Sequence, residues 1–371
     1  MNGFFLKKRT RRDFLQNTAK FCFTSGLSVI LSGCLEKEAS IVETATAVET
    51  PVKTPVETAA GFEPAYLKLY ETGELAERAE QLWAIMESCR LCPRTCGVNR
   101  LEGTRGFCGA PGARLVVSAS HPHFGEERPL VGMGGSGTIF LTHCNLRCVF
   151  CQNWEISQRG RGFNREIEDL ADMMLRLQKV GCHNINLVTP THYSAVILKA
   201  LNIAAEKGLR LPIVYNTSGW ERLEILEFLD GVVDIYLPDF KYWDSDMSAK
   251  YSSGAESYPE ITSEAILEMH RQVGVAKTPK SGIMKRGLMI RHLVMPNNVG
   301  GSEKIMEWIA ESLPKDTYVN IMAQYTPLFK AYDYPEISRR ITKEEYVKVV
   351  DRAKELGLTN LDIQGYWWLP G

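Results

Sequence analysis

From residue 137 onward, short apolar or β-branched segments alternate with longer segments whose apolar side chains recur at helical spacing. The strand-like segments are residues 137–143, 184–189, 212–217, 232–237, 288–294 and 317–322. Helical patterns lie between them at residues 166–180, 194–207, 221–229, 261–275 and 302–312. Six such units with short polar connections predict a mostly parallel sheet that curls into a full or partial barrel.

Further elements flank these six units. Residues 342–356 predict a last helix, because Thr342 is a capping residue with Glu345 three positions on, and the segment LDIQGYWW after it could add a short final strand. Residues 63–88 are rich in Glu, Leu and Ala at helical spacing, which indicates one or two helices. We therefore predict the α/β fold class: a partial (β/α)6 TIM-like barrel with an N-terminal helical segment. In such a barrel, chemistry takes place at the carboxyl ends of the strands.

Length and charge narrow the classes of function. A chain of 371 residues is long enough for one large domain with a smaller appendage, or for two ordinary domains. The 43 basic and 44 acidic residues give a formal net charge of -1, so no electrostatic surface for nucleic acid is indicated. We expect no nucleic-acid partner.

The amino terminus has the pattern of a targeting segment. A basic stretch at residues 7–12 precedes an apolar run, residues 21–31, that is too short to span a bilayer. Residues 10–16, TRRDFLQ, resemble a twin-arginine export signal. Residues 31–34, LSGC, resemble a lipobox, whose Cys34 would become the acylated first residue of the mature protein.

Residues 1–34 therefore predict a twin-arginine, lipoprotein-type signal, with the protein exported and anchored to a membrane only through lipid on Cys34. The alternative is an uncleaved leader with a chance Gly-Cys pair, which would leave the protein cytoplasmic. Residues 35–60 are rich in Thr, Val, Glu, Ala and Pro without periodicity, which predicts a flexible linker. Folding is expected to begin near residue 61.

Eight of the ten cysteines remain once Cys22 and Cys34 of the leader are set aside. An even number in an exported protein could form four disulfides. The spacing favours metal sites instead, because seven of the eight fall in two tight groups and only Cys182 stands alone. We expect Cys182 to be a small buried core residue.

The first group predicts a metal site in a segment that has no apolar core of its own. Its spacing is C-x2-C-x3-C-x11-C, and its members are Cys89, Cys92, Cys96 and Cys108. Four thiolates would hold either a structural zinc ion or an auxiliary iron-sulfur cluster, and two disulfides are the alternative. We expect residues 61–130 to combine the helical segment with this four-cysteine site.

The second group lies directly after the first strand of the barrel, with the spacing C-x3-C-x2-C at Cys144, Cys148 and Cys151. A structural zinc site needs a fourth ligand, and His143 would point the opposite way from Cys144 on an extended segment. A cubane iron-sulfur cluster bound by three thiolates leaves one iron open to another ligand. The missing fourth protein ligand would then have a function, because it leaves that iron free to bind another molecule.

A three-cysteine motif at this position resembles the radical S-adenosylmethionine (AdoMet) superfamily. Other segments are similar to the homologues of pyruvate formate-lyase activating enzyme: CRLCPRTCGVNR, HFGEERPLVG, PTHY, YNTSGW, DIYLPDFKY, RHLVMP and QYTP. The resemblance implies that residues 131–371 form a radical AdoMet barrel, with Cys144, Cys148 and Cys151 as ligands of a [4Fe-4S] cluster. AdoMet would bind the open iron and yield a 5′-deoxyadenosyl radical for hydrogen abstraction.

The resemblance also implies contacts to AdoMet. Phe150 would pack near the adenine. Lys241 and Asp239 resemble the Asp-x-Lys of glycyl-radical activating enzymes, whose lysine meets the AdoMet carboxylate, and an exposed loop cation is the alternative reading of Lys241. The Gly-Gly-Glu turn that usually receives the AdoMet amino group is absent here, and Thr191 could accept that group instead.

Two polar residues on strands complete the expected site. Asn216 ends the third strand and Arg291 lies in the fifth, so both would point toward the barrel mouth or lumen. A buried arginine needs a partner, so Arg291 is either ligand-facing or paired with a carboxylate such as Asp239.

A polar turn ahead of the first barrel strand has two interpretations. Its ionisable residues are His121, His123, Glu126 and Glu127. They could ligate a metal or serve as acid-base groups, or the turn could pack over the barrel rim without a role in chemistry.

Two functions from different classes follow. The first is a radical AdoMet enzyme that acts on an unidentified substrate, such as a glycyl-radical activase or a protein maturase, with a flavodoxin- or ferredoxin-like electron donor. The alternative is an exported, non-catalytic iron-sulfur electron-transfer lipoprotein, whose cluster AdoMet would not perturb.

Overall fold

The computed structural model describes residues 62–279 and 281–365, so the predicted signal and linker lie outside the described residues. Within these ranges one sheet has the strand order β3-β1-β2-β4-β5-β6-β7-β8-β9. The strands are β1 (Leu115–His123), β2 (Ser136–Leu141), β3 (Phe163–Arg165), β4 (Ile185–Val188), β5 (Ile213–Thr217), β6 (Ile235–Pro238), β7 (Gly287–Leu293), β8 (Tyr318–Met322) and β9 (Leu361–Ile363).

The sheet is mostly parallel and has two free edges. Strands β2 and β4 to β9 run parallel to one another, whereas β1 is antiparallel to both β2 and β3. Because β3 and β9 end the strand order without pairing to each other, the sheet forms an open, partial barrel. The six predicted strands and the short final strand are confirmed, and the sheet extends back to Leu115, ahead of the predicted start of the barrel at residue 131.

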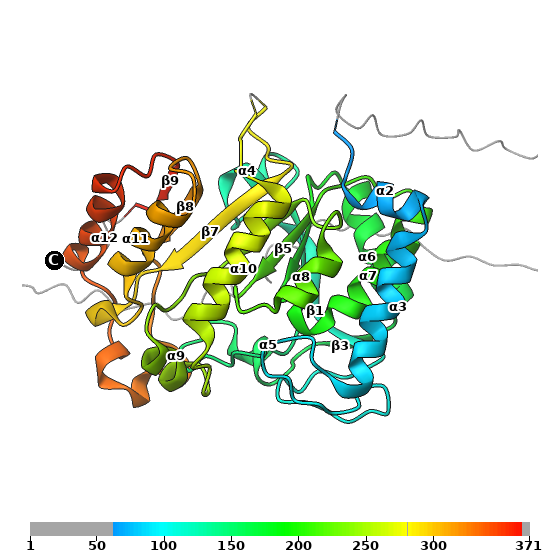
Figure 1. Ribbon diagram of the computed structural model, residues 1–371, viewed down its shortest axis with the longest axis horizontal. Helices are drawn as coiled ribbons and strands as arrows, with labels where there is room; N and C mark the ends of the chain where they lie inside the picture. The colour runs from blue at the N-terminus through cyan, green and yellow to red at the C-terminus, as the bar shows by residue number, and fades with distance from the viewer. Residues whose placement is uncertain (1–61, 280, 366–371) are drawn as a thin grey trace, which may run out of the picture. The chain divides into compact units, whose positions relative to one another are not determined.

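Helices connect and cover the strands. They are α2 (Tyr66–Glu71), α3 (Glu74–Ala84), α4 (Arg128–Val131), α5 (Trp154–Ser157), α6 (Ile167–Lys179), α7 (Ser194–Glu206), α8 (Leu223–Leu229), α9 (Ser245–Tyr251), α10 (Tyr258–Val273), α11 (Ser302–Ser312) and α12 (Lys343–Glu355). In Figure 1, α3 runs beside α7, α10 lies beside β7, and α11 packs near α12. Thr342 and Glu345 form the predicted capping box of α12.

Side chains on the two faces of the sheet belong to two separate apolar cores. On β7, Leu288 and Ile290 join the large core under the outer helices, whereas Met289 joins an inner core with Val214 of β5 and Leu237 of β6. Because strand side chains alternate between faces, Arg291 shares the inner face with Met289, and Asn216 shares it with Val214. The barrel lumen therefore has an apolar layer with a polar layer toward the carboxyl ends of the strands.

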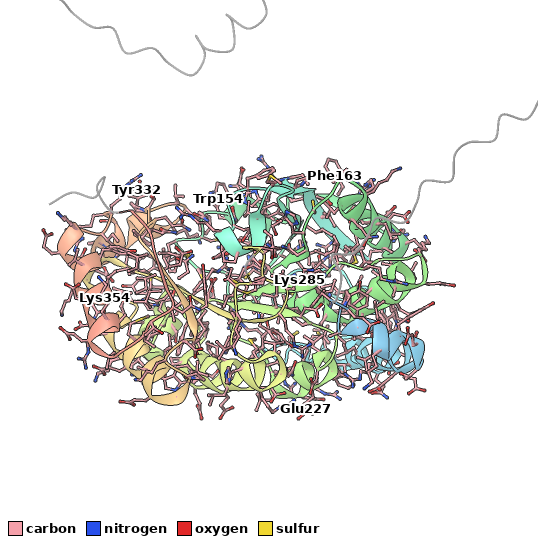
Figure 2. All side chains as sticks on the ribbon, turned by 90° about the horizontal axis from the view of Figure 1, so that it is seen from above. Trp154, Phe163, Glu227, Lys285, Tyr332 and Lys354 are labelled. Atoms are coloured by element: carbon pink, nitrogen blue, oxygen red, sulfur yellow. The ribbon has the colours of Figure 1, made fainter. Side chains whose placement is uncertain are left out.

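The two sides of the barrel carry different elements. Figure 2 shows Glu227, in the outer helix α8, at one edge of the view and Trp154, just after the three-cysteine loop, at the opposite edge. The rings of Trp154 and Phe329 stack with centroids 5.1 Å apart, so the chain after β8 packs against the segment that follows the cysteines. In the described part of the chain, no helix is both long enough and apolar enough to span a membrane.

Candidate active site

A cavity of about 470 Å³ lies at the carboxyl ends of the parallel strands. All three cysteines of the loop after β2 line it, and so do Asp239, after β6, and Arg291, in β7. A second hollow, of about 540 Å³, lies between α3 and α8, but Glu74, Glu77, Arg78 and their neighbours line it without a thiol. The chemistry-bearing residues therefore gather in the first cavity.

The loop after β2 turns its three sulfur atoms into this cavity. Two of its residues, His143 and Arg147, have left-handed backbone conformations, with φ of 67° and 53°. Hydrogen-bonding groups surround the sulfurs: the Leu146 N–H donates to Cys144 Sγ at 3.4 Å, Ser252 Oγ lies 3.0 Å from Cys148 Sγ, and Ser157 Oγ lies 3.2 Å from Cys151 Sγ. Such contacts orient and stabilise metal-bound thiolates.

His143 takes no part in this cavity. Its Nδ1 lies 2.7 Å from Thr142 Oγ1, and its ring packs against Gly109 and Gly160 on the other side of the loop. Burial lowers the pKa of His143 to about 4, with nearby arginines adding to the effect. The expectation that His143 points away from the thiols is confirmed.

The electrostatics of the three thiols favour a bound cation. Burial, with a smaller effect of the neighbouring Cys148, raises the pKa of Cys144 to about 11 against the lowering effect of Lys241. Burial also raises the pKa of Cys148 and that of Cys151. Three buried thiolates this close together are costly unless a metal centre neutralises them, so the donor set fits a metal-sulfur cluster.

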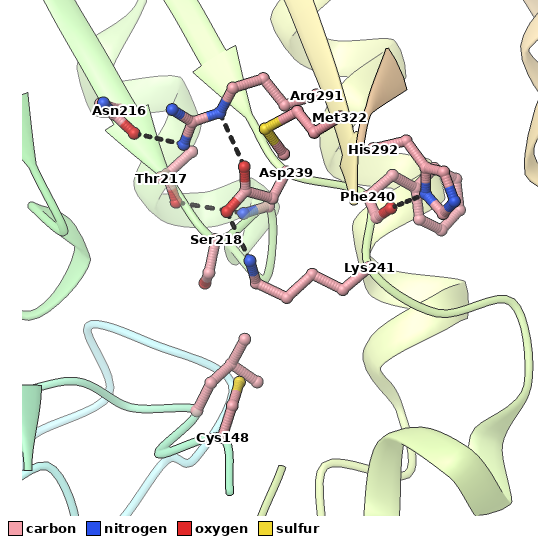
Figure 3. A network of polar contacts seen from close by, with 12 residues as sticks. Cys148, Asn216, Thr217, Ser218, Asp239, Phe240, Lys241, Arg291, His292 and Met322 are labelled. Atoms are coloured by element: carbon pink, nitrogen blue, oxygen red, sulfur yellow. Dashed lines mark hydrogen bonds and ion pairs between the residues drawn. The ribbon is translucent and has the colours of Figure 1, made fainter. Parts of the chain in front are cut away.

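Asp239 organises the cationic side of the cavity (Figure 3). Arg291 donates from Nε to Asp239 Oδ1 at 2.7 Å and from Nη2 to Asn216 Oδ1 at 2.6 Å. Lys241 pairs with the other carboxylate oxygen of Asp239, and its side chain is 17% exposed, so it is not an exposed loop cation. The expected pair of Arg291 with Asp239 is therefore present.

The ion pairs of this network keep Asp239 and Lys241 in their charged forms. Burial alone would raise the pKa of Asp239, but Arg291 and Lys241 hold it below its usual value. Burial would lower the pKa of Lys241, yet Asp239 and Cys148 raise it above its usual value. Lys241 lies between Asp239 and Cys148 in Figure 3, so a fixed positive charge faces the cysteine loop.

Most of the residues expected to contact AdoMet line the cavity, namely Phe150, Asn216, Asp239, Lys241 and Arg291. Phe150 packs against the rings of Tyr242 and Tyr325, with centroids 6.3 Å and 5.8 Å away. Thr191 does not line the cavity, because it is buried and donates to Glu221 Oε1 at 2.5 Å. Thr189, with φ of 61°, lines the cavity instead.

The polar turn after β1 also reaches the cavity. His123 and Glu126 line it, and Arg291 Nη1 lies 4.0 Å from both Glu126 and Glu127. Burial raises the pKa of Glu126 to about 7, while Arg291 lowers it. The sequence left open whether this turn only packs over the rim. In the structure Glu126 and His123 lie on the cavity wall, whereas His121 does not line it.

Sequence reasoning missed the polar residues that follow β5 and β8. Thr217 at the end of β5, Ser218 directly after it, and Gln324 to Thr326 after β8 line the cavity. Their positions directly after buried strands, in the segments YNTSGW and QYTP, were the available signal. Chemistry at the carboxyl ends of parallel strands makes such positions informative.

The four-cysteine segment packs beside the loops at the carboxyl ends of β2 and β4. Its thiols lie close enough to interact electrostatically, and burial raises the pKa of Cys92 to about 12, with Cys108 and Cys89 adding to the effect. The buried Arg100 donates to the carbonyl oxygens of His192 at 2.8 Å and Pro111 at 2.6 Å. All cysteines of the described residues are free thiols, including Cys182 in the core. The two disulfides that the sequence left as an alternative for the four-cysteine segment are therefore not formed.

Comparisons with known proteins agree with this geometry. Residues 138–309 match the family described as the radical SAM superfamily. The chain is 34% identical over 286 residues to uncharacterized protein MJ0674 of Methanocaldococcus jannaschii, which covers 74% of this chain and 76% of that protein.

Two solved structures are similar at 14% sequence identity. One is a radical SAM methyltransferase from Sphaerobacter thermophilus, with a TM-score of 0.42 over 61% of this chain and 65% of that chain. The other is a domain of pyruvate-formate lyase-activating enzyme from Bacteroides vulgatus, with a TM-score of 0.31 over 54% of this chain and 91% of that chain. These structural likenesses carry no information about the substrate.

Proposed function

The chain belongs to the radical SAM superfamily, and from this premise we propose that it is an enzyme that cleaves AdoMet reductively and abstracts a hydrogen atom from a substrate. Membership implies a [4Fe-4S] cluster and AdoMet, and we assign the cluster to Cys144, Cys148 and Cys151. When bound and reduced, such a cluster would supply the electron for the reductive cleavage of AdoMet.

One observation carries the proposal: the three thiols and the Asp239 network line the same cavity. Lys241 presents a fixed cation for the AdoMet carboxylate, and Asp239 holds that lysine in place. Phe150, anchored between two tyrosine rings, offers an apolar wall for the adenine. A carrier that only passes electrons has no use for a cavity of about 470 Å³ beside its cluster.

The resemblance of residues 238–241 to the Asp-x-Lys of glycyl-radical activating enzymes supports a protein substrate. The enzyme would then be a glycyl-radical activase or a protein maturase, with a flavodoxin- or ferredoxin-like protein as its electron donor.

The test is the production of 5′-deoxyadenosine. The anaerobically reconstituted protein is reduced with excess AdoMet, beside the variants Cys148→Ala and Cys182→Ala. We expect product from the wild type and from Cys182→Ala, because Cys182 is a buried core residue away from the cavity. Cys148→Ala should make none. A fully loaded wild-type protein that makes no product, and whose cluster spectrum is unchanged by AdoMet, would favour the electron carrier.

We further propose that Cys89, Cys92, Cys96 and Cys108 bind a second metal, either zinc or an auxiliary iron-sulfur cluster. The burial of three of these thiols and their mutual electrostatic effects support this. Metal analysis of Cys92→Ser should show the loss of one centre, whereas Cys182→Ser should keep both. Equal metal contents in the two variants would contradict the second site.

We also propose that the protein is exported by its twin-arginine signal with its cluster already inserted, and that lipid on Cys34 anchors it. The signals in residues 1–34 support this proposal. Cell fractionation would contradict it by finding the protein only in the cytosol with its leader intact.

A further inference from the structure

The two cysteine segments carry an excess of positive charge. Residues 89–114 contain five arginines and one acidic residue, and residues 144–165 contain four arginines and one acidic residue, in a chain whose formal net charge is -1. Three of these arginines, Arg105, Arg147 and Arg159, lie at least partly exposed around the three-cysteine loop. We call these three arginines, together with Phe107 and Trp154, the basic face.

The buried ring of His143 brings the two segments together. A Cβ added to Gly109 would lie 3.2 Å from that ring, and one added to Gly160 would lie 2.7 Å from it, so both glycines approach the ring closely. Arg105 donates to the Gly109 carbonyl oxygen at 3.2 Å, and Arg159 directly precedes Gly160. The two arginines therefore belong to one surface although they are far apart in the sequence.

Arg147 lies on the same surface. It donates to the Phe107 carbonyl oxygen at 3.2 Å, and its guanidinium lies 5.6 Å from the centroid of the Phe107 ring, which is 37% exposed. Burial and the charges of Arg105 and Arg147 lower the pKa of His143. His143 directly precedes Cys144, so these charges gather beside the start of the three-cysteine loop.

Neighbouring carboxylates do not neutralise these arginines. Within the described part of the chain, Arg105 and Arg147 donate to backbone carbonyl oxygens, and the Arg159 guanidinium lies 4.4 Å from the centroid of the Trp154 ring. Arg161, by contrast, forms an ion pair with an acidic neighbour. Unpaired charges of one sign on a surface attract a partner of the opposite sign and steer its approach.

The basic face lies outside the cavity that is assigned to AdoMet. Cys144 and Cys148 line that cavity, whereas Arg147, between them in the sequence, does not. Arg105 and Arg159 do not line it either. The three-cysteine loop therefore has one surface toward the cavity and another toward the basic face.

Only a thin layer of protein separates the basic face from the cysteines. Ser157, in α5, has its Oγ 3.2 Å from Cys151 Sγ, and the Gln158 side chain donates to the carbonyl oxygen of Cys148 at 2.7 Å. Arg159 is the next residue, and Trp154, over which it stacks, lies at the edge of the molecule in Figure 2. Electron tunnelling weakens steeply with distance, so a redox partner on this surface would be well placed.

We propose that the basic face is the docking surface for the protein that reduces the cluster, and that this partner is a small one-electron carrier with acidic side chains around its cofactor. The inference rests on the proposed function, because it names the docking site and the charge of the electron donor that the radical enzyme requires. One electron passes from the partner's reduced cofactor to the cluster, and no bond forms or breaks. Since the face lies outside the cavity, the partner binds while AdoMet is in place.

The test measures binding without turnover. The anaerobically reconstituted protein is titrated with oxidised flavodoxin, an acidic carrier, and with oxidised cytochrome c, a basic carrier, each with and without AdoMet, and calorimetry reports the Kd. We expect flavodoxin to bind and cytochrome c not to bind. The Kd for flavodoxin should stay within about twofold when AdoMet is added, and it should rise about 10-fold when salt is raised from about 0.02 M to about 0.2 M.

Variants locate the docking surface. The triple variant Arg105→Gln, Arg147→Gln, Arg159→Gln should raise the Kd for flavodoxin about 10-fold, because each exposed charge contributes about two- to fivefold. Arg159→Gln alone should raise it about two- to threefold. Arg286→Gln is the matched control: Arg286 is exposed, donates to the Gln272 carbonyl oxygen at 3.0 Å and precedes β7 at the opposite end of the strands, so its loss should leave the Kd unchanged.

Iron content and thermal midpoint show that each variant is folded and loaded. Reduction of the cluster by dithionite, a small reductant that needs no docking surface, should be equal in all variants. Reduction by flavodoxin hydroquinone should be slower in the triple variant than in the wild type and in Arg286→Gln.

The outcomes separate this inference from the proposed function. No binding of flavodoxin at low salt, equal or tighter binding of cytochrome c, wild-type affinity in the triple variant, or displacement of flavodoxin by AdoMet would each overturn the docking surface. The 5′-deoxyadenosine assay with dithionite is independent of docking. Flavodoxin binding that depends on the three arginines, in a protein that makes no 5′-deoxyadenosine with dithionite, would uphold the docking surface and contradict the radical enzyme.

Discussion

Arg94 donates from Nε to the carbonyl oxygen of Asn145 across 2.9 Å, which joins the four-cysteine segment to the loop that carries Cys144. The same guanidinium donates to the carbonyl oxygens of Ser252 at 3.0 Å and Ser253 at 2.8 Å. Ser252 in turn lies against Cys148. One side chain thus ties the three-cysteine loop to the end of α9.

Replacing Arg94 by alanine should destabilise the protein and loosen the cluster. The half-buried guanidinium also stacks on Phe107 at 4.0 Å from the ring centroid, so the change removes several charge-assisted hydrogen bonds and a cation–π contact. We expect a loss of about 2–4 kcal/mol in the free energy of unfolding, measured by urea under anaerobic conditions, with a lower iron content.

Arg90→Ala is the matched control in the same segment. The Arg90 side chain is 48% exposed and lies 3.7 Å from Glu224, so its loss should cost less than about 1 kcal/mol. Equal losses of unfolding free energy in the two variants would show that the Arg94 hydrogen bonds do not stabilise the three-cysteine loop.

Lys241→Met should weaken the binding of AdoMet while the cluster still assembles. The change removes the cation that faces the cavity and leaves Asp239 with Arg291 as its remaining partner. We expect the Kd for AdoMet to rise about 10- to 100-fold, as the loss of a buried charged contact implies. The measurement is the AdoMet-dependent change in the EPR spectrum of the reduced cluster.

Lys250→Met is the control that tests whether the loss of any nearby lysine weakens the binding of AdoMet. Lys250 pairs with Glu336 and its side chain is 45% exposed, so we expect AdoMet affinity to stay within about twofold of the wild type. An unchanged Kd in Lys241→Met would remove Lys241 from the AdoMet site.

Gly219→Ala should disturb the site through the backbone of Asp239. Gly219 has φ of 83°, and an added Cβ would lie 2.3 Å from the Asp239 carbonyl oxygen. The alanine must therefore adopt a strained conformation and also push the Asp239 segment away, at a cost of about 3–5 kcal/mol. We expect lower thermal stability together with weaker AdoMet binding.

Gly208→Ala separates conformational strain from lack of space. Gly208 has φ of 92°, but no atom lies within 4 Å of the Cβ position. Its substitution should cost only about 1–2 kcal/mol and leave AdoMet binding intact. If both variants bind AdoMet as the wild type does, the close approach of Gly219 has no role in the site.

The sequence predicted the parallel part of the fold well, because buried parallel strands are apolar runs bounded by helical patterns. Strand β1 was missed because its sequence, LVVSASHPH, combines an apolar start with Ser, His and Pro, and it pairs antiparallel on a half-exposed face. Strand β3 has three residues and packs mainly by pairing with β1, so no periodicity could reveal it.

The candidate site was predictable where residues follow a strand directly. Cys144, Asp239 and Lys241 were found in this way. Glu126 was named only in one of two interpretations of a polar turn, because it reaches the cavity from the turn after β1 and not from the end of a parallel strand. Thr191 has the right residue type for the AdoMet amino group, but the chain turns it toward Glu221. Which way a side chain turns after a strand depends on tertiary packing that local sequence does not encode.

Glu221 should make the stability of the protein depend on pH. It is fully buried, and burial raises its pKa from 4.5 to about 7, while Thr191 and Thr217 lower it by donating hydrogen bonds. The folded state therefore holds this proton more tightly than the unfolded state does. The contribution of Glu221 to stability is fully present below pH 4.5 and is lost as the pH rises toward 7, by about 3 kcal/mol in all.

Glu221→Gln isolates this contribution, because glutamine keeps the shape and does not titrate. Other buried groups titrate in both proteins, and they cancel in the difference between the two free energies of unfolding. Between pH 5 and pH 8, the wild type should lose about 2–3 kcal/mol relative to the variant, measured by anaerobic urea unfolding. A difference that stays constant over this range would mean that the carboxyl group is already ionised at pH 5, with partners that stabilise the charge, and would contradict a raised pKa.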